Sequence, residues 1–228
     1  MHRAFFIAGT DTDVGKTTIA AGLLHAARLA GLSTAAVKPV ASGCERTEQG
    51  LRNSDALALL AECSLALDYA TVNPFAFEPA IAPHIAAREA GVELTAARLI
   101  EAVQPVMARQ AGVTLVEGAG GWRVPLNARE HLSALPAALG LPVILVVGVR
   151  LGCINHALLS AEAIARDGLA LVGWVANIID PATSRLDDNL ATLAELLPAP
   201  CLGQVPRLAA PTARQVARYL TLPALQPV

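Results

Sequence analysis

Residues 4–18, AFFIAGTDTDVGKTT, constrain the fold more than any other stretch of the chain. An apolar run typical of a β-strand breaks into a loop bounded by Gly9 and Gly15, and Lys-Thr-Thr follows where a helix would begin. The glycines let the backbone approach a polyphosphate and turn its N–H groups inward, and the next helix adds its partially positive N-terminus. Lys16 would reach the outer phosphates, and the Thr17 hydroxyl would bind Mg²⁺. The sequence therefore predicts a strand, a phosphate-binding loop and a helix.

The loop departs from the usual spacing. Five residues, 10–14, separate its glycines, where the standard motif has four. Thr10 also stands where the strict pattern has glycine. The order of strand, loop, Gly-Lys-Thr and helix is kept, so we expect the mechanism to be kept as well. An ordinary strand, turn and helix with a surface lysine remains the alternative.

Composition narrows the class of protein. A chain of 228 residues suits one large α/β domain, and we expect a single domain over residues 1–228 rather than two small ones. The net charge of -2 offers no basic stripe for nucleic acid. Apolar residues reach 54% and charged residues only 16%, an excess that a buried self-association surface would explain.

The apolar stretches predict no membrane segment. The longest, residues 139–149, is too short to span a bilayer, and the N-terminus passes directly into the first strand without a secretory segment. We therefore expect a cytoplasmic protein. The four cysteines contain no CxxC pair and are expected to be reduced.

Strand and helix patterns alternate along the whole chain. This alternation predicts an α/β fold with a mostly parallel sheet covered by helices on both faces, a three-layer sandwich of the P-loop NTPase type. The expected strands are 5–8, 34–37, 113–116, 143–147, 170–176 and 201–205. The expected helices include 17–30, 94–108, 186–197 and 212–220.

Two expected strands end in residues suited to phosphate chemistry. Lys38 follows strand 34–37 and opens the loop 38–43, at the edge where open α/β sheets bind ligands. Glu117 follows strand 113–116 and enters a glycine-rich turn, where a carboxylate can hold Mg²⁺ directly or through water. The alternatives are that Lys38 is only a solvated lysine before a proline and that Glu117 and the glycines after it form only a turn.

A further carboxylate lies at an expected helix start. Ser54 has the character of an N-cap, which puts Asp55 in the first turn of the helix. An acidic residue there complements the helix dipole, or it binds a metal beside the phosphate loop. The local pattern leaves both readings open.

Two later segments are also candidates. Residues 152–155 open an apolar helix whose free N–H groups could bind an anion such as a carboxylate. The Cys153 and His156 pair lacks the second pair that a zinc site needs. Asn177 ends a strand, and its amide suits a nucleotide base edge as well as a turn.

Taken together, these residues resemble the dethiobiotin synthetases. The resemblance covers most of the chain. The stretches GLRNSDALAL and LGCINHA are much more specific to the family than the phosphate loop, because many unrelated proteins share such a loop. The matching stretches include GTDTDVGKT at 9–17, KPVASG at 38–43, GLRNSDALAL at 50–59, VEGAGGW at 116–122 and LGCINHA at 151–157.

The resemblance implies a homodimeric ligase of biotin biosynthesis. Such an enzyme closes a cyclic urea on 7,8-diaminononanoate with carbon dioxide, drawn from bicarbonate, using ATP and Mg²⁺. In that family a carbamate forms on one amine, its oxygen attacks the γ-phosphate, and the second amine displaces phosphate from the mixed anhydride.

The resemblance also implies roles for individual residues. Lys16, Lys38 and Thr12 would be catalytic, and Thr17, Asp55 and Glu117 would serve Mg²⁺. The nucleotide would be bound by Asp13, Val14, Gly15, Lys16, Thr17, Thr18, Asp55, Glu117, Gly118, Ala119, Gly120, Asn177, Pro206, Arg207 and Leu208. The substrate would be bound by Thr12, Lys38 and Ser42 of one subunit and by Gly152, Cys153, Ile154 and Asn155 of the other.

The C-terminal region departs from the family pattern. Residues 207–218 lack the acidic residue that some relatives place near the base, which would weaken selection among nucleoside triphosphates more than binding itself. Two other functions remain in competition. One is an ATP-dependent partitioning switch, although its usual extra lysine is missing from residues 10–14 and the C-terminal residues 220–228 are uncharged. The other is a related ligase with a different substrate. Trp122 is expected to pack rather than to bind ligand.

Overall fold

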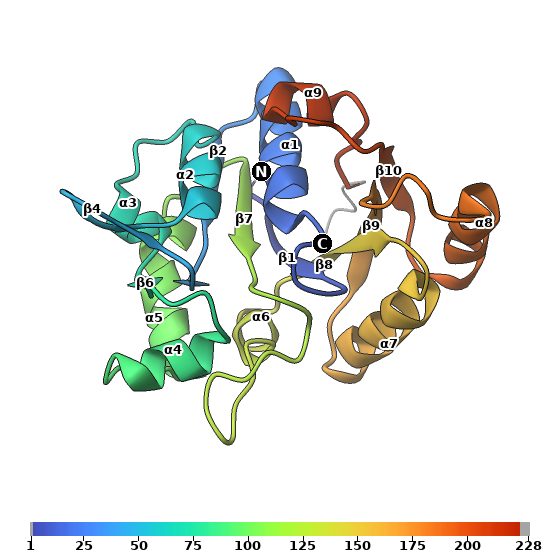
Figure 1. Ribbon diagram of the computed structural model, residues 1–228. Coiled ribbons are helices and arrows are strands. Elements are labelled where there is room, and N and C mark those ends of the chain that lie inside the picture. The colour runs from blue at the N-terminus through green and yellow to red at the C-terminus, as the bar shows by residue number, and fades with distance from the viewer. Residues whose placement is uncertain (1, 224–228) are drawn as a thin grey trace.

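The computed structural model describes residues 2–223 (Figure 1). Its strands are β1 (Ala4–Gly9), β2 (Thr34–Val37), β3 (Val40–Ala41), β4 (Glu45–Thr47), β5 (Gly50–Arg52), β6 (Phe75–Ala76), β7 (Val113–Glu117), β8 (Val143–Val149), β9 (Leu171–Ile178) and β10 (Cys201–Val205). Its helices are α1 (Lys16–Leu29), α2 (Ser54–Ala61), α3 (Tyr69–Val72), α4 (Pro83–Glu89), α5 (Ala96–Met107), α6 (Ala134–Leu139), α7 (Cys153–Arg166), α8 (Leu186–Leu196) and α9 (Ala213–Ala217).

Six of these strands form a parallel sheet in the order β10, β9, β8, β1, β7, β2. β1 lies in the interior between β7 and β8. From β1 the chain goes to the edge strand β2, returns to β7 beside β1, and then proceeds outward on the other side through β8, β9 and β10. Every strand of this sheet therefore ends at the same edge, which confirms the expected parallel α/β architecture.

Alternation along the strands divides the core into two layers. On β1, Phe5 and Ile7 face α1, α2 and α9, whereas Phe6 and Ala8 face α5, α6, α7 and α8. The two groups of helices lie on opposite faces of the sheet (Figure 1). This arrangement is the expected three-layer sandwich. A strand in its middle layer is buried on both faces and must therefore be apolar at every position.

Glycines with positive φ flank α1: its N-cap Gly15 has a φ of 84°, and Gly31, which follows the C-cap Ala30, has a φ of 76°. A Cβ on Gly22, in the middle of the helix, would lie 2.6 Å from Cγ1 of Val216. This glycine therefore lets α9 pack closely against α1.

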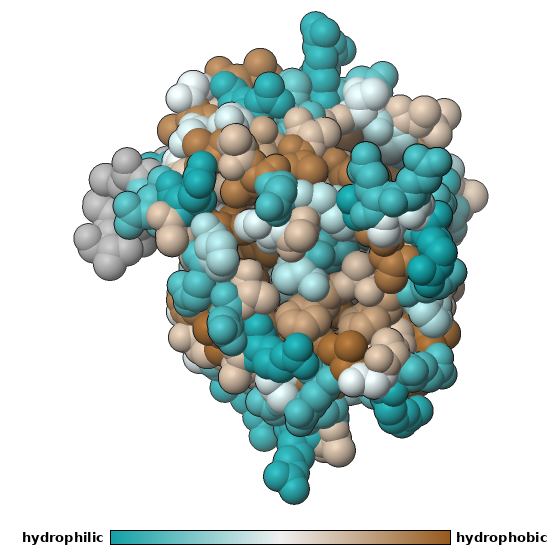
Figure 2. Space-filling view, turned by 90° about the vertical axis from the view of Figure 1, so that its left-hand side faces the viewer, coloured by the Kyte–Doolittle hydropathy of each residue, from teal (hydrophilic) through white to brown (hydrophobic). Residues whose placement is uncertain are grey.

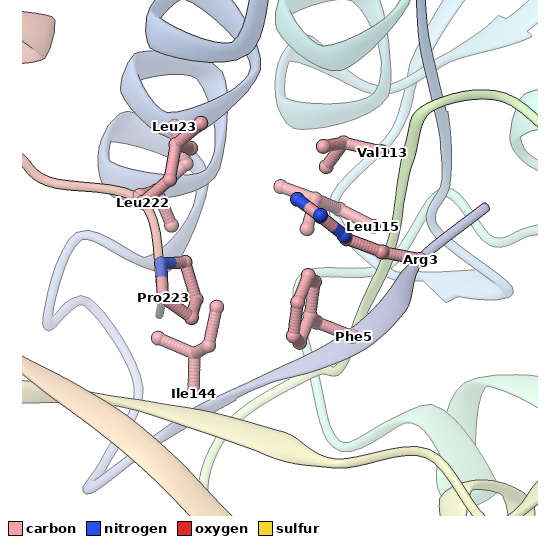
Figure 3. Close-up of a pocket in the computed structure, with 8 residues that line it drawn as sticks. All are labelled: Arg3, Phe5, Leu23, Val113, Leu115, Ile144, Leu222 and Pro223. Atoms are coloured by element: carbon pink, nitrogen blue, oxygen red, sulfur yellow. The ribbon is translucent and has the colours of Figure 1, made fainter. Parts of the chain in front are cut away.

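A small apolar pocket of about 10 Å³ lies at the opposite edge of the sheet from the strand ends. Leu23, Leu222 and Pro223 lie on one side of it, opposite Phe5 and Leu115 (Figure 3). Its volume is about that of one water molecule. We therefore assign it to packing of the C-terminal segment.

Several local expectations were wrong. Ser54 is not an N-cap, because Oδ1 of Asn53 accepts the bond from the Ala56 N–H and Ser54 is the first helical residue. Residues 45–52, which are not among the expected strands, contain the antiparallel β4 and β5 hairpin. The loop 38–43 contains β3, which pairs with β6, and the last expected helix ends at Ala217 rather than at residue 220.

Among residues 2–223, we find no helix that combines the length and the apolar character needed to cross a membrane. Figure 2 shows the face that carries α2, α3 and the β4 and β5 hairpin. On this face hydrophobic side chains gather mainly in the upper half, with hydrophilic ones between them.

Candidate active site

The loop between β1 and α1 lies at the carboxyl edge of the sheet. Asp13 and Gly15 both adopt positive φ, 58° and 84°, which bends the backbone into a tight curve before the helix. Thr10 does not need glycine's freedom, because its N–H continues the pairing with β8 and its hydroxyl accepts from the Gly148 N–H at 3.4 Å. The unusual spacing is therefore compatible with a phosphate loop.

Lys16 joins this loop to the glycine-rich turn. Its Nζ donates to the carbonyl oxygens of Asp11 at 3.0 Å and Gly120 at 2.7 Å. Burial lowers the pKa of Lys16 from 10.5 to about 8, although the carboxylate of Glu117 acts in the opposite direction. A buried ammonium bound to neutral carbonyls would gain strongly from an anion, as a phosphate-binding lysine should.

Glu117 is the centre of a cluster of charged side chains. It is 0% exposed, and its Oε1 accepts hydrogen bonds from Lys38 Nζ at 2.6 Å and from Thr17 Oγ1 at 2.7 Å. Lys38 Nζ also lies 2.9 Å from Oδ2 of Asp55. The sequence predicted each of these four residues separately, and the fold brings them into direct contact.

The ion pairs change the protonation of their members. Burial disfavours the ammonium of Lys38, but Glu117 and Asp55 outweigh it and raise the pKa of this lysine. Burial likewise disfavours the carboxylate of Asp55, but Lys38 holds the pKa of Asp55 below its ordinary value. Both charges are therefore kept at neutral pH.

This cluster fits a magnesium ion. Oε2 of Glu117 is buried and has no hydrogen-bond partner, and the Thr17 hydroxyl and the half-exposed Asp55 carboxylate complete a set of oxygen donors. Within residues 2–223 no group of three or more His, Cys, Asp or Glu side chains is arranged to hold a metal. Mg²⁺ does not require one, because it usually keeps several waters and substrate phosphate oxygens.

Strand order explains why these residues meet. The phosphate loop follows β1, Glu117 ends β7 and Lys38 follows β2. These three strands are neighbours, with Ile7 aligned on Glu117 and Val37 aligned on Val116. Parallel neighbours of matched register end at the same height, which delivers their last side chains to one place.

The glycine-rich turn, residues 118–121, lies against the phosphate loop. A Cβ on Gly118 would approach the Phe6 ring to 2.8 Å, and one on Gly120 would lie 3.6 Å from Oγ1 of Thr12. Thr12 therefore sits beside the turn, with Ala119 between its two close glycines. Trp122 is buried in edge-to-face contact with Phe6 at 5.9 Å, which confirms that it packs.

Asn177 forms a hydrogen bond to the phosphate loop. Its Nδ2 donates to the Val14 carbonyl oxygen at 2.8 Å, so part of its amide supports the phosphate loop. Val205 is aligned on Asn177, which places residues 206–208 beyond the neighbouring strand end. The two expected base-contacting segments therefore share one edge, but Asn177 has a structural bond that its sequence did not indicate.

The remaining substrate candidates lie on two other segments. Ser42 follows β3, and its carbonyl oxygen accepts from Asn53 Nδ2 at 3.5 Å. Gly152 is the N-cap of α7 with φ of 92°, followed by the buried Cys153 and the less buried Ile154 and Asn155. Arg150, just before them, forms an ion pair with Asp11 at 2.7 Å.

A cleft of about 410 Å³ opens beside the charged cluster. Thr17 and Thr18 of α1 and Asp55 of α2 line one part of it, and Pro211 and Ala213 contribute from the segment after β10. Several of its walls are alanines, which leave room for a ligand. The cleft thus extends the phosphate and magnesium region toward solvent.

Comparisons with known proteins show the family of the chain. A family model described as an AAA domain matches residues 3–215. The ATP-dependent dethiobiotin synthetase BioD of Pseudomonas paraeruginosa is 77% identical over 219 residues, with 96% of each chain covered. The enzyme of the same name from Cellvibrio japonicus is 61% identical over 220 residues, again with 96% of each chain covered. The chain belongs to the dethiobiotin synthetase family.

Solved structures place this dethiobiotin synthetase family member among P-loop NTPase folds. The septum site-determining protein MinD of Pyrococcus horikoshii OT3, complexed with Mg-ADP, aligns with a TM-score of 0.57 and 17% identity over 95% of this chain and 85% of its own. A ParA family ATPase of Chlorobium tepidum TLS aligns with a TM-score of 0.56 and 13% identity over 96% and 94%. At these identities the likeness shows the fold alone.

The sequence did not indicate a role for some residues that connect the segments of the site. Asn53, Tyr69 and Asn73 form hydrogen bonds that link α2 to the backbone of Lys38. Asn53 lies in the matching stretch GLRNSDALAL, but the sequence suggested no role for any of the three, because each is an ordinary polar residue near a helix end. Their significance appears only when the helices are packed.

Proposed function

We propose that this chain is an ATP-dependent dethiobiotin synthetase that converts 7,8-diaminononanoate, carbon dioxide and ATP into dethiobiotin, ADP and phosphate. The observation that carries the proposal is the identity of 77% to a relative of that name across 96% of both chains. The contacts among Lys38, Glu117, Asp55 and Thr17 support it, because a buried lysine paired with two carboxylates beside a phosphate loop suits phosphoryl transfer.

The nucleotide phosphates would occupy the loop of residues 13–18, where Lys16 would exchange its carbonyl partners for phosphate oxygens. Lys38 would stabilise charge on the transferring phosphoryl group from the other side. Thr17, Asp55 and Glu117 would hold Mg²⁺, which supplies charge neutralisation to the triphosphate when bound. Phosphoryl transfer asks a protein mainly for positioning and positive charge, and these residues offer both.

Binding of the diamine would use residues at the edge of the loop. Thr12 and Ser42 would hold the carbamate end and would place it near the γ-phosphate for attack. The second amine would then displace phosphate from the mixed anhydride. Because this ring closure is intramolecular, holding both ends of the substrate can replace much acid and base catalysis.

The substrate carboxylate would bind at residues 152–155 of a second subunit, so the proposed enzyme is a homodimer. Leu151, just before the N-cap of α7, and Leu159, within α7, are 91% and 55% exposed, which supports a subunit interface there. We further propose that residues 1–228 form a single domain and that the protein is cytoplasmic. Gly118, Ala119 and Gly120 would face the phosphates, and Asn177 and residues 206–208 would face adenine.

The testing experiment is a mass-spectrometric assay with purified protein, MgATP, labelled bicarbonate and 7,8-diaminononanoate. Labelled dethiobiotin with an equal amount of ADP is the expected result. ADP release without diamine, stimulated by DNA or lipid, would overturn the proposal in favour of a partitioning switch. No turnover from a folded protein that binds ATP would overturn it in favour of a different ligase substrate.

A further inference from the structure

The backbone of Lys38 is held from both sides by one short segment. Its N–H donates to the Val72 carbonyl oxygen at 2.8 Å, and its own carbonyl oxygen accepts from Nδ2 of Asn73 at 2.8 Å. Asn73 is the C-cap of α3 and is only 3% exposed. A buried amide in this position fixes where the Lys38 side chain starts.

Tyr69 links this segment to the helix that carries Asp55. Its hydroxyl donates to Oδ1 of Asn73 at 3.0 Å and accepts from the Asn53 N–H at 2.7 Å. Asn53 is the N-cap of α2, 5% exposed, and its Oδ1 receives the Ala56 N–H. One hydroxyl thus bridges the cap of α2 and the amide that binds Lys38.

The bridge ties together the two partners of an ion pair. Asp55 is the second residue of α2, and its Oδ2 lies 2.9 Å from Lys38 Nζ. Lysine and aspartate side chains are flexible, and their mutual position depends on the backbone atoms from which they extend. Within residues 2–223, the hydroxyl of Tyr69 is the only hydroxyl whose hydrogen bonds connect the start of α2 with the segment that holds the Lys38 backbone.

We propose that Tyr69 is a positioning residue that sets the distance between α2 and Lys38 for phosphoryl transfer. It acts through Asn53 and Asn73 and touches no reacting atom. The proposal rests on the catalytic role proposed for Lys38. Preorganised charge is effective only while its geometry is held, and small displacements far from the chemistry can cost large factors in rate.

The test is Tyr69→Phe, which removes the hydroxyl and keeps the ring that Arg52 covers at 4.3 Å. The matched control is Tyr219→Phe, the other tyrosine of the chain, which is 43% exposed. We expect Tyr69→Phe to lower kcat by about tenfold or more with KM for ATP changed by less than about twofold. Tyr219→Phe should leave both constants unchanged.

A second background separates positioning from general damage to the fold. In Lys38→Ala, Tyr69→Phe should lower kcat by less than about twofold, because the group that it positions has been removed. An equal loss of kcat in both backgrounds would overturn the proposal, as would unchanged kcat for Tyr69→Phe alone. If Lys38→Ala itself turns over normally, the catalytic role proposed for Lys38 is wrong. The inference about Tyr69 then fails as well, and the single Lys38→Ala variant identifies the reason.

Discussion

Replacement of Lys38 by methionine tests the charged cluster most directly. Methionine has a similar length and no charge, so it removes the ammonium without opening a large cavity. Glu117, which is 0% exposed, would then keep only the Thr17 hydroxyl as a hydrogen-bond partner. The variant therefore leaves the buried carboxylate without its hydrogen-bonded cation, and only the more distant charge of Lys16 still acts on it.

The magnitude follows from that burial. Breaking a buried ion pair by removal of one partner costs about 3–5 kcal/mol, because the remaining charge is uncompensated. Asp55 contributes little to this cost, since its side chain is 44% exposed and can be hydrated. At about 2–4 °C per kcal/mol for a chain of this size, we expect the melting temperature to fall by roughly 6–20 °C.

The control is the double variant Lys38→Met with Glu117→Gln. It removes both charges of the 2.6 Å pair and should recover most of the lost stability, because replacement of both partners of a buried pair is often neutral. Turnover should fall by on the order of 10² or more in both variants. Stability and activity would thus respond differently to the second substitution.

The assay is thermal and urea unfolding without nucleotide, at one protein concentration because any dimer makes stability concentration-dependent. A melting temperature for Lys38→Met within about 2 °C of wild type would refute the uncompensated charge. A double variant no more stable than Lys38→Met would refute it as well.

Three further predictions test single features. Gly15→Ala should abolish detectable ATP binding in calorimetry while the protein stays folded. The reason is that φ at this position is 84° and a Cβ would overlap the side-chain amide of Asn177, at the end of β9. Micromolar ATP binding by this variant would contradict the geometry. Asn53→Ala should lower the free energy of unfolding by about 1 kcal/mol or more, as expected for a lost N-cap, whereas Ser54→Ala should change it little; the reverse order in urea titrations would mean that the cap is assigned wrongly. Burial raises the pKa of Cys63 from 9.0 to about 11, so at pH 8, below both values, its thiolate fraction is about 100-fold smaller than that of a free thiol. Iodoacetamide followed by peptide mass spectrometry should therefore label the exposed Cys201 well before Cys63, and equal rates would argue against that burial.

Much of the fold could be predicted because it is encoded by local periodicity. Strands 34–37 and 201–205 were predicted with their observed bounds, and the helix after the phosphate loop was displaced by one residue. Apolar runs of strand length that alternate with helical patterns leave few alternatives in a chain of this kind. The helix caps were less predictable, since Asn53 and Ser54 are adjacent residues that both favour N-caps.

The sequence by itself determined the phosphate loop, the charged residues at the strand ends and the family to which the chain belongs. Only the tertiary structure decided that Glu117 lies against Lys38 and Thr17, and that Asn177 bonds to Val14. Motifs are local and can be read from spacing. Contacts between β2 and β7 join residues nearly eighty positions apart, so they depend on strand order and on how both faces of the sheet are packed.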